Sequence, residues 1–248
     1  GMSSKDFFTP SKNEHVKCVQ HWMGTGDFFF CHWIAESEDA ILDFLIEGGE
    51  DQFFHTMCAE MDYYITPNDG NNDIYAGGDN DTITAGSGDD TISAGDGDDN
   101  VTSGIGNDTI TAGSGDDIVK GGTGNDAIDG NLGNDELHGE QGADTIKGDE
   151  GDDLIYGGEG NDTLHGGQGA DTLDAGSGDS TSLANKLYGD GGEDILKGGD
   201  ASDELDGGAD NDTITGAGGN DLIRGGSGED NLSGEGGDDV IWGGAGRD

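Results

Sequence analysis

The chain repeats a nine-residue pattern seen in AGSGDDTIS at residues 85–93 and in GGEGNDTLH at residues 157–165. Both stretches fit Gly-Gly-x-Gly-x-Asp-x-U-x, where U is aliphatic, and we number the positions of the repeat one to nine in that order. The pattern starts near Gly70 and continues to Asp248. A fixed period of this kind is typical of a solenoid, in which each repeat adds one unit to a stack.

The sixth position of the repeat is an aspartate eighteen times, and these side chains are the candidate metal ligands. The eighth position is aliphatic in the same repeats, from Ile83 to Ile241. The candidate ligands are Asp81, Asp90, Asp99, Asp108, Asp117, Asp126, Asp135, Asp144, Asp153, Asp162, Asp171, Asp194, Asp203, Asp212, Asp221, Asp230, Asp239 and Asp248.

The period also predicts how the repeats are arranged. Six residues of turn and three of strand make half a coil, so two repeats complete one rung, and residues eighteen apart lie on neighbouring rungs. The sequence therefore predicts a mainly β fold with two parallel sheets and two inward-facing aliphatic ladders. It also contains fourteen pairs of position-six aspartates separated by eighteen residues, each of which can share one cation.

Composition limits how this 248-residue chain can fold. It has 52 glycines and only 30% hydrophobic residues, which leaves little material for an ordinary core. Nine Lys and Arg against 55 Asp and Glu give a formal net charge of −46, so the chain should repel nucleic acids and anionic membranes and attract cations. No apolar run is long enough to span a membrane, and the first twenty residues lack the hydrophobic core of a secretory signal peptide.

The repeats need a counter-charge in order to fold. Ordering nine residues costs roughly 9 to 18 kcal/mol, whereas burying one Ile or Leu returns only about 1.5 to 3 kcal/mol. Calcium takes six to eight oxygen ligands, which aspartates and the carbonyls of a glycine turn can supply. We therefore expect calcium binding and folding to be a single event, with on the order of fourteen ions bound.

The repeats resemble the calcium-binding repeats of the RTX family, which occur in bacterial haemolysins, proteases, lipases and surface proteins. The resemblance covers about three-quarters of the chain. It implies a right-handed parallel β-roll in which the position-six aspartates and turn carbonyls of successive rungs coordinate calcium. It also implies a bacterial protein, secreted or at the cell surface, that a type I secretion machine exports and that folds on meeting calcium outside the cell.

An insertion interrupts the period at residues 175–188, which are fourteen residues instead of nine. Either Ser180 or Asn185 stands where an aspartate is expected. We expect one rung to bulge there and one aspartate ladder to be divided.

Four other residues depart from the repeat. Position four is Asp79, Ala201 or Asp210 in three repeats, where a left-handed backbone without glycine costs about 1 kcal/mol. We expect those turns to be distorted or to leave their ion sites unfilled. Asn72 stands at position six of the first repeat and should leave a weak end rung.

Residues 1–66 are expected to form a separate domain ahead of the roll at 67–248, because they hold most of the aromatic residues and all three cysteines. Such a small unit needs the roll, or a second copy of itself, to cover its sheet, so a homodimer through this unit stays open. We expect the unit to cap the open end of the roll. Its pattern predicts an α+β unit in the order ββαβ, with strands at 16–23 and 28–35, a helix at 37–47 and a strand at 53–65.

Two interpretations apply to the histidines and cysteines of this unit. His21, His32 and His55, with Cys18, Cys31 and Cys58, could form a transition-metal site. The stronger interpretation is that the cysteines are buried as small apolar residues and the histidines lie in aromatic surfaces.

Catalysis is not expected from this sequence. It contains no His-Glu-x-x-His, and the GGSGE at residues 225–229 lacks the final glycine of a nucleophile elbow. One alternative is that the chain is the C-terminal part of an RTX enzyme whose catalytic domain is absent, since in RTX proteases and lipases an enzyme domain precedes the repeats. Another is an adhesive or ice-binding surface module, because Thr82/Thr84, Thr109/Thr111 and Thr213/Thr215 could form flat rows.

Overall fold

The computed structural model describes residues 70–176 and 184–247 in full, together with the backbone of five strands before them. The chain divides into two compact units, Gly1–Gly49 and Glu50–Asp248. No helix occurs among the described residues, and so none is available there to cross a membrane. The five early strands are β1 (Val19–Met23), β2 (Phe28–Ile34), β3 (Ile41–Glu47), β4 (Cys58–Ala59) and β5 (Tyr64–Ile65).

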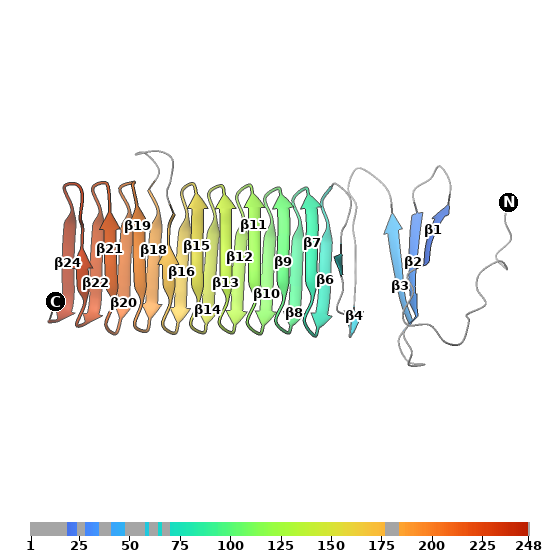
Figure 1. Cartoon of the computed structure of the whole chain (residues 1–248), viewed down its shortest axis with the longest axis horizontal. Helices are drawn as coiled ribbons and strands as arrows, with labels where there is room; N and C mark the ends of the chain where they lie inside the picture. The colour runs from blue at the N-terminus through green and yellow to red at the C-terminus, as the bar shows by residue number, and fades with distance from the viewer. Residues whose placement is uncertain are drawn as a thin grey trace. The chain divides into compact units, whose positions relative to one another are not determined.

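The larger unit contains a solenoid of two parallel sheets, whose strands stack side by side in Figure 1. Even-numbered strands from β4 to β24 form an eleven-stranded sheet, and odd-numbered strands from β5 to β23 form a ten-stranded sheet. Successive strands therefore alternate between the sheets, and every turn crosses from one sheet to the other. The remaining strands are β6 (Asp73–Gly78), β7 (Thr82–Ser87), β8 (Thr91–Asp96), β9 (Asn100–Ile105), β10 (Thr109–Ser114), β11 (Ile118–Thr123), β12 (Ala127–Leu132), β13 (Glu136–Gln141), β14 (Thr145–Glu150), β15 (Leu154–Glu159), β16 (Thr163–Gln168), β17 (Thr172–Asp174), β18 (Lys186–Gly191), β19 (Ile195–Gly199), β20 (Glu204–Ala209), β21 (Thr213–Ala217), β22 (Leu222–Gly228), β23 (Asn231–Ser233) and β24 (Val240–Gly246).

The register of these sheets confirms that two repeats make one rung. Ile110 of β10 lies opposite Ile92 of β8 and Ile128 of β12, which are eighteen residues away on either side. Each position-eight side chain therefore stacks on its equivalents in neighbouring rungs, as the sequence predicts. The right-handed sense of the coil stays a prediction.

The core is a double row of aliphatic side chains between the two sheets. Leu232 is only partly buried and Ile241 is 43% exposed, because β23 and β24 are the last described strands of their sheets. The other position-eight side chains are at most 2% exposed, and they are Ile83, Ile92, Val101, Ile110, Val119, Ile128, Leu137, Ile146, Ile155, Leu164, Leu173, Leu187, Leu196, Leu205, Ile214 and Ile223.

The two sheets continue across the insertion, although Asn185 stands in place of an aspartate in one of the two aspartate rows. Leu164 pairs with Leu187, and Leu173 pairs with Leu196, at a separation of 23 residues instead of 18. Residues 177–183, which include Ser180, lie outside the described residues. The solenoid tolerates the extra residues because they lie between two strands, β17 and β18, and leave the pairing of both strands intact.

The two strands predicted at 16–23 and 28–35 are confirmed by β1 and β2. Strands β1 and β2 are antiparallel, and Met23 lies opposite Phe28 across the turn. The two short strands β4 and β5 pair in parallel with β6 and β7. The described parts of the strand predicted at 53–65, β4 and β5, thus belong to different sheets, and the domain boundary at residue 67 stays a prediction.

The helix predicted at residues 37–47 is wrong, because Ile41–Glu47 is strand β3, antiparallel to β2. A short apolar run such as ILDFLIE fits a helix face or a buried strand equally well from its periodicity. Pairing with β2, in which Phe30 lies opposite Leu45, decides in favour of the strand. The order ββαβ is therefore not found, and the capping role of this unit stays a prediction.

Candidate metal centre

The position-six aspartates form two rows of buried carboxylates, one row in each set of turns. Asp126 and Asp135 are both 2% exposed, and neighbouring rungs repeat this arrangement. Burial holds for every position-six aspartate from Asp81 to Asp230. Asp239 is only partly buried, and Asp248 lies outside the described residues, so the predicted pair Asp230/Asp248 stays a prediction.

One oxygen of each carboxylate is used in a ladder of hydrogen bonds along the row. The N–H of Asp126 donates to Oδ1 of Asp144 at 2.8 Å, and the N–H of Asp144 donates to Oδ1 of Asp162 at 3.0 Å. The ladder of the other row continues across the insertion, where the N–H of Asp171 donates to Oδ1 of Asp194 at 2.8 Å. These two aspartates are 23 residues apart in sequence, and only the structure makes them neighbours.

The other oxygen of each carboxylate is buried without a partner. Within residues 70–176 and 184–247, Oδ2 accepts no hydrogen bond in these aspartates, although it is shielded from solvent. An unpartnered buried carboxylate oxygen is costly, because neither water nor a donor compensates for its lost hydration. The aspartates are Asp90, Asp99, Asp108, Asp117, Asp126, Asp135, Asp144, Asp153, Asp162, Asp171, Asp194, Asp203, Asp212 and Asp221.

Glycine at position one leaves a small space beside this oxygen. A Cβ placed on Gly121 would lie 2.5 Å from Oδ2 of Asp126 and 3.0 Å from the carbonyl oxygen of Gly139 on the next rung. A Cβ on Gly157 would likewise meet Oδ2 of Asp162. A carboxylate oxygen and a main-chain carbonyl oxygen therefore border the same space, and hard oxygen donors of these two kinds suit calcium.

Burial shifts the acidity of the carboxylates. Desolvation is the main cause, with the charges of nearby aspartates adding to it, and together they raise the pKa of Asp117 and Asp126 to about 7. Backbone hydrogen bonds to Oδ1 oppose the shift. Burial raises the pKa of Asp171 and Asp194 to about 7 also, and it raises the pKa to about 6 for Asp90, Asp135, Asp144, Asp162, Asp212 and Asp221.

The raised pKa values mean that the compact roll does not favour bare carboxylates at neutral pH. Protons or cations that neutralise the carboxylates remove this cost. No group of three or more His, Cys, Asp or Glu side chains converges on one point in the fully described part of the chain. Backbone carbonyls such as that of Gly139 lie close enough to the row to add oxygen ligands for a cation.

Two positions of each turn adopt a left-handed backbone. Position four is one, and there Asp79 and Asp210 have φ values of 79° and 76°, as expected for strained turns, whereas Ala201 does not adopt this conformation. Position two is the other. The sequence does not reveal its left-handed backbone, because residues other than glycine occur there without breaking the repeat. Its non-glycine residues with positive φ are Asn131, Glu140, Asp149, Asp190, Ala217 and Glu235.

Two asparagines take the place of position-six aspartates. Asn72 is 1% exposed and donates from Nδ2 to Oδ1 of Asp90 at 2.9 Å. Asn185 is 2% exposed and accepts the N–H of Asp162 at 2.9 Å, so the ladder uses Asn185 and not Ser180. Neither residue brings a carboxylate, and the sites beside them carry less negative charge.

The second metal site stays a prediction. The register of β1 and β2 places His21 opposite Phe30 and His32 opposite Val19. The side chains of His21, His32, His55, Cys31 and Cys58, and all of Cys18, lie outside the described residues.

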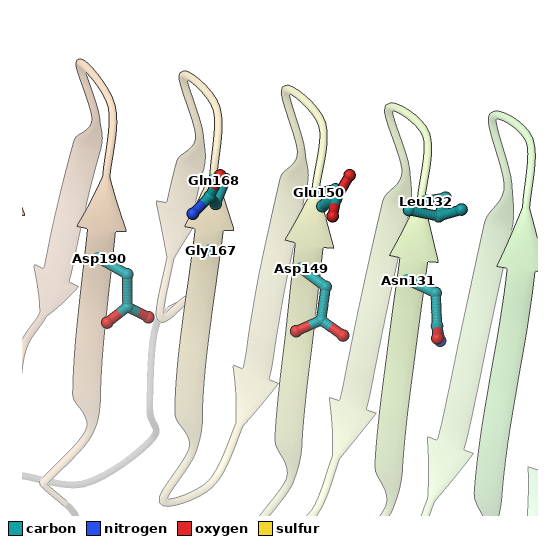
Figure 2. Close-up of a pocket in the computed structure, with 7 residues that line it drawn as sticks. All are labelled: Asn131, Leu132, Asp149, Glu150, Gly167, Gln168 and Asp190. Carbon is teal, nitrogen blue, oxygen red and sulfur yellow. The ribbon is translucent and has the colours of Figure 1, made fainter.

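A shallow groove of about 550 Å³ lies along one sheet, at repeat positions two and three. Figure 2 shows its residues on β12, β14, β16 and β18, in step from rung to rung. Three carboxylates, from Asp149, Glu150 and Asp190, face this groove. The lining residues are Asn131, Leu132, Asp149, Glu150, Gly167, Gln168 and Asp190.

Comparison with known proteins gives one family. A family model described as the RTX calcium-binding nonapeptide repeat (4 copies) matches residues 66–101, 102–137, 111–146, 129–164, 147–181, 179–214, 188–223 and 215–248. These matches together extend from residue 66 to residue 248, which is well over half of the chain. No curated protein matches it.

Proposed function

Because this chain belongs to the RTX calcium-binding nonapeptide repeat family, we propose that its roll is a calcium-binding module whose ions lie in the two rows of position-six aspartates. In each site, Oδ2 carboxylate oxygens and turn carbonyls from adjacent rungs act as the ligands. The number of ions is on the order of fourteen, and Asp171 with Asp194 forms an additional pair that bridges the insertion.

The observation that carries the proposal is the unpartnered Oδ2 of the buried aspartates. Their Oδ1 atoms are already committed to N–H groups of the preceding rung, at 2.7 to 3.0 Å. From Asp126 to Asp221, their Oδ2 atoms lie beside the position-one glycines of the same turns. A divalent cation there removes the cost of both the desolvated oxygen and the mutual repulsion of the row.

Calcium binding is then the condition for folding. The formal charge of −46 opposes compaction, and the hydrophobic core has only one aliphatic side chain per repeat at position eight. We propose that the roll is unfolded where calcium is scarce and folds where it is abundant. This supports a module of an exported bacterial protein, passed by type I secretion machinery and working outside the cell.

The test is a pair of measurements in chelator and in millimolar calcium. Circular dichroism should show parallel β structure only with calcium, and the hydrodynamic radius should fall on its addition. Calorimetry should find many ions per chain. An identical β spectrum in chelator and in calcium would contradict coupled folding.

The ice-binding alternative gains little support from the outer faces of the sheets. Thr84 and Thr102 are neighbours on β7 and β9, but Lys120 follows on β11 and His138 on β13. The threonine row is therefore short and ends in charged or bulky side chains. Measurement of thermal hysteresis on calcium-loaded protein tests it directly, and none is expected.

A further inference from the structure

Position five of the repeat carries a second row of hydrogen bonds, separate from the aspartate ladder. The side chains that form this row are exposed, and each of them accepts the N–H of the position-five residue on the following rung. Oδ1 of Asn125 accepts the N–H of Ala143 at 2.8 Å, and Oδ1 of Asp116 accepts the N–H of Asn134 at 2.8 Å. The other acceptors are Asn71, Asn80, Asp89, Asp98, Asn107, Asn134, Asp152, Asn211 and Asn220, with Ser202 accepting through Oγ at 2.9 Å.

The two rows point in opposite directions along the roll. In the turn at residues 142–144, the N–H of Ala143 donates back to Asn125, whereas the N–H of Asp144 donates forward to Asp162. This turn is thus bonded to the rung before it and to the rung after it through two consecutive peptides. The forward bond uses the N–H of the position-six aspartate itself, and the backward bond uses the N–H of the residue before it.

The backward bond also aims a carbonyl. In a trans peptide, the N–H of Ala143 and the C=O of Gly142 point in opposite directions. Since this N–H points to the preceding rung, the carbonyl oxygen of Gly142 points to the following one. A Cβ placed on Gly160 would strike that oxygen, which confirms the direction. The carbonyl is therefore directed into the space between rungs, next to the row of carboxylates.

The position-five row has a gap in the middle of the roll. Ala143 and Ala170 receive bonds from the preceding rung, but they carry no side-chain acceptor for the next one. The row resumes only at Ser202 and Asn211. Side-chain contacts between strands cross this gap instead, where His165 stacks on Tyr188 at 4.6 Å and Lys197 binds Asp174 at 2.9 Å.

We propose that the position-five Asn, Asp and Ser side chains are positioning residues for the calcium sites. They hold the peptide that joins positions four and five. The position-four carbonyl therefore stays directed into the space between the rungs, where it can bind an ion. This inference rests on the proposed function, but it concerns residues outside the position-six ligand set. It also marks the turns after Ala143 and Ala170 as the ones with the least prearranged carbonyls.

The test compares three variants of one turn in the full chain. Asn125→Ala removes the acceptor without changing charge, Asn125→Ser keeps an oxygen of the kind Ser202 uses, and Thr123→Ala changes an exposed residue of the same turn as a control. Loss of one hydrogen bond worth about 1 kcal/mol corresponds to about a fivefold change in affinity. We expect the calcium midpoint of folding to rise for Asn125→Ala and to stay near wild type for Asn125→Ser and Thr123→Ala.

A converse variant and a spectroscopic probe sharpen the test. Ala143→Asn should extend the row to the N–H of Asn161 and lower the calcium midpoint. Terbium bound in place of calcium should show a shorter luminescence lifetime in Asn125→Ala at saturation, because water replaces the misaligned carbonyl. A purely structural role would leave that lifetime unchanged.

The outcomes separate this inference from the proposed function. If wild type binds calcium but Asn125→Ala matches Thr123→Ala, or Asn125→Ser fails to restore the midpoint, the positioning role is overturned and the calcium module stands. If wild type binds no calcium, both are overturned.

Discussion

Replacing Asp126 by asparagine should have opposite effects with and without calcium. Asp126 is buried, its Oδ1 accepts the N–H of Asp108 at 2.8 Å, and its Oδ2 has no partner. The asparagine side chain keeps the shape and the Oδ1 acceptor. The substitution removes only the oxygen that we assign to calcium, together with its charge.

The magnitude without calcium follows from the pKa. Burial raises the pKa of Asp126 from its ordinary 3.8 to about 7. At about 1.36 kcal/mol for each pKa unit, the ionised side chain costs the metal-free compact roll on the order of 4 kcal/mol at neutral pH. Asp126→Asn removes that cost, so in chelator the chain should become compact at a lower concentration of a stabilising osmolyte.

The magnitude with calcium has the opposite sign. Removing one partner of a buried ion pair costs about 3 kcal/mol or more, which is roughly a hundredfold in affinity at that site. The calcium midpoint of folding, followed by circular dichroism, should therefore rise.

The control is Asp116→Asn, which removes the same charge from an exposed position-five residue and keeps its Oδ1 acceptor for the N–H of Asn134. It should change both midpoints only slightly. The reasoning fails if Asp126→Asn shifts folding in the same direction in chelator and in calcium, or if the two variants behave alike.

Three further predictions test the core, the turns and the titration of the row. Leu164→Ala should lower the free energy of unfolding of the calcium-loaded roll by about 2 to 5 kcal/mol in a denaturant titration, because Leu164 is 0% exposed and leaves a cavity between two sheets. Gly124→Ala should abolish or severely weaken calcium-dependent folding, because φ at Gly124 is 134° and a Cβ there would strike the carbonyl oxygen of Gly106. In chelator, the compact form should be most stable below about pH 4 and lose stability up to about pH 7, because carboxyl groups with a raised pKa hold protons in the folded state that they release in the unfolded state.

Each of these three predictions has a matched control or a second measurement. Leu232→Ala removes the same side chain where burial is only partial, and should cost less. Gly78→Ala places a Cβ where no atom lies within 4 Å, and should fold nearly as wild type. With an osmolyte holding the metal-free roll compact, proton release on calcium addition, measured in a pH-stat, should be largest between about pH 4 and 7. Stability of the compact form that rises with pH in chelator would contradict the assignment of the buried carboxylates.

Much of the roll could be predicted because its information is local and repeated. The alternation of a glycine turn with one aliphatic residue places Ile110 between Ile92 and Ile128 without knowledge of any distant contact. The aspartate rows follow from the same period. Outside the repeats, local pattern was insufficient, because Ile41–Glu47 satisfies a helix and a strand equally and only its pairing with β2 decides between them.

The sequence by itself determined the solenoid, the two-repeat rung and the acidic row, since a nine-residue period acts at every copy and errors at one copy do not spread. Tertiary structure alone decided that Asp171 and Asp194 are neighbours, because strand pairing, and not sequence separation, sets which turns stack. It also decided that Oδ1 of Asp144 accepts a hydrogen bond whereas its Oδ2 does not, and that Asn125 at position five accepts the N–H of the following rung. Such roles depend on the direction of each peptide in space, which a period in the sequence does not specify.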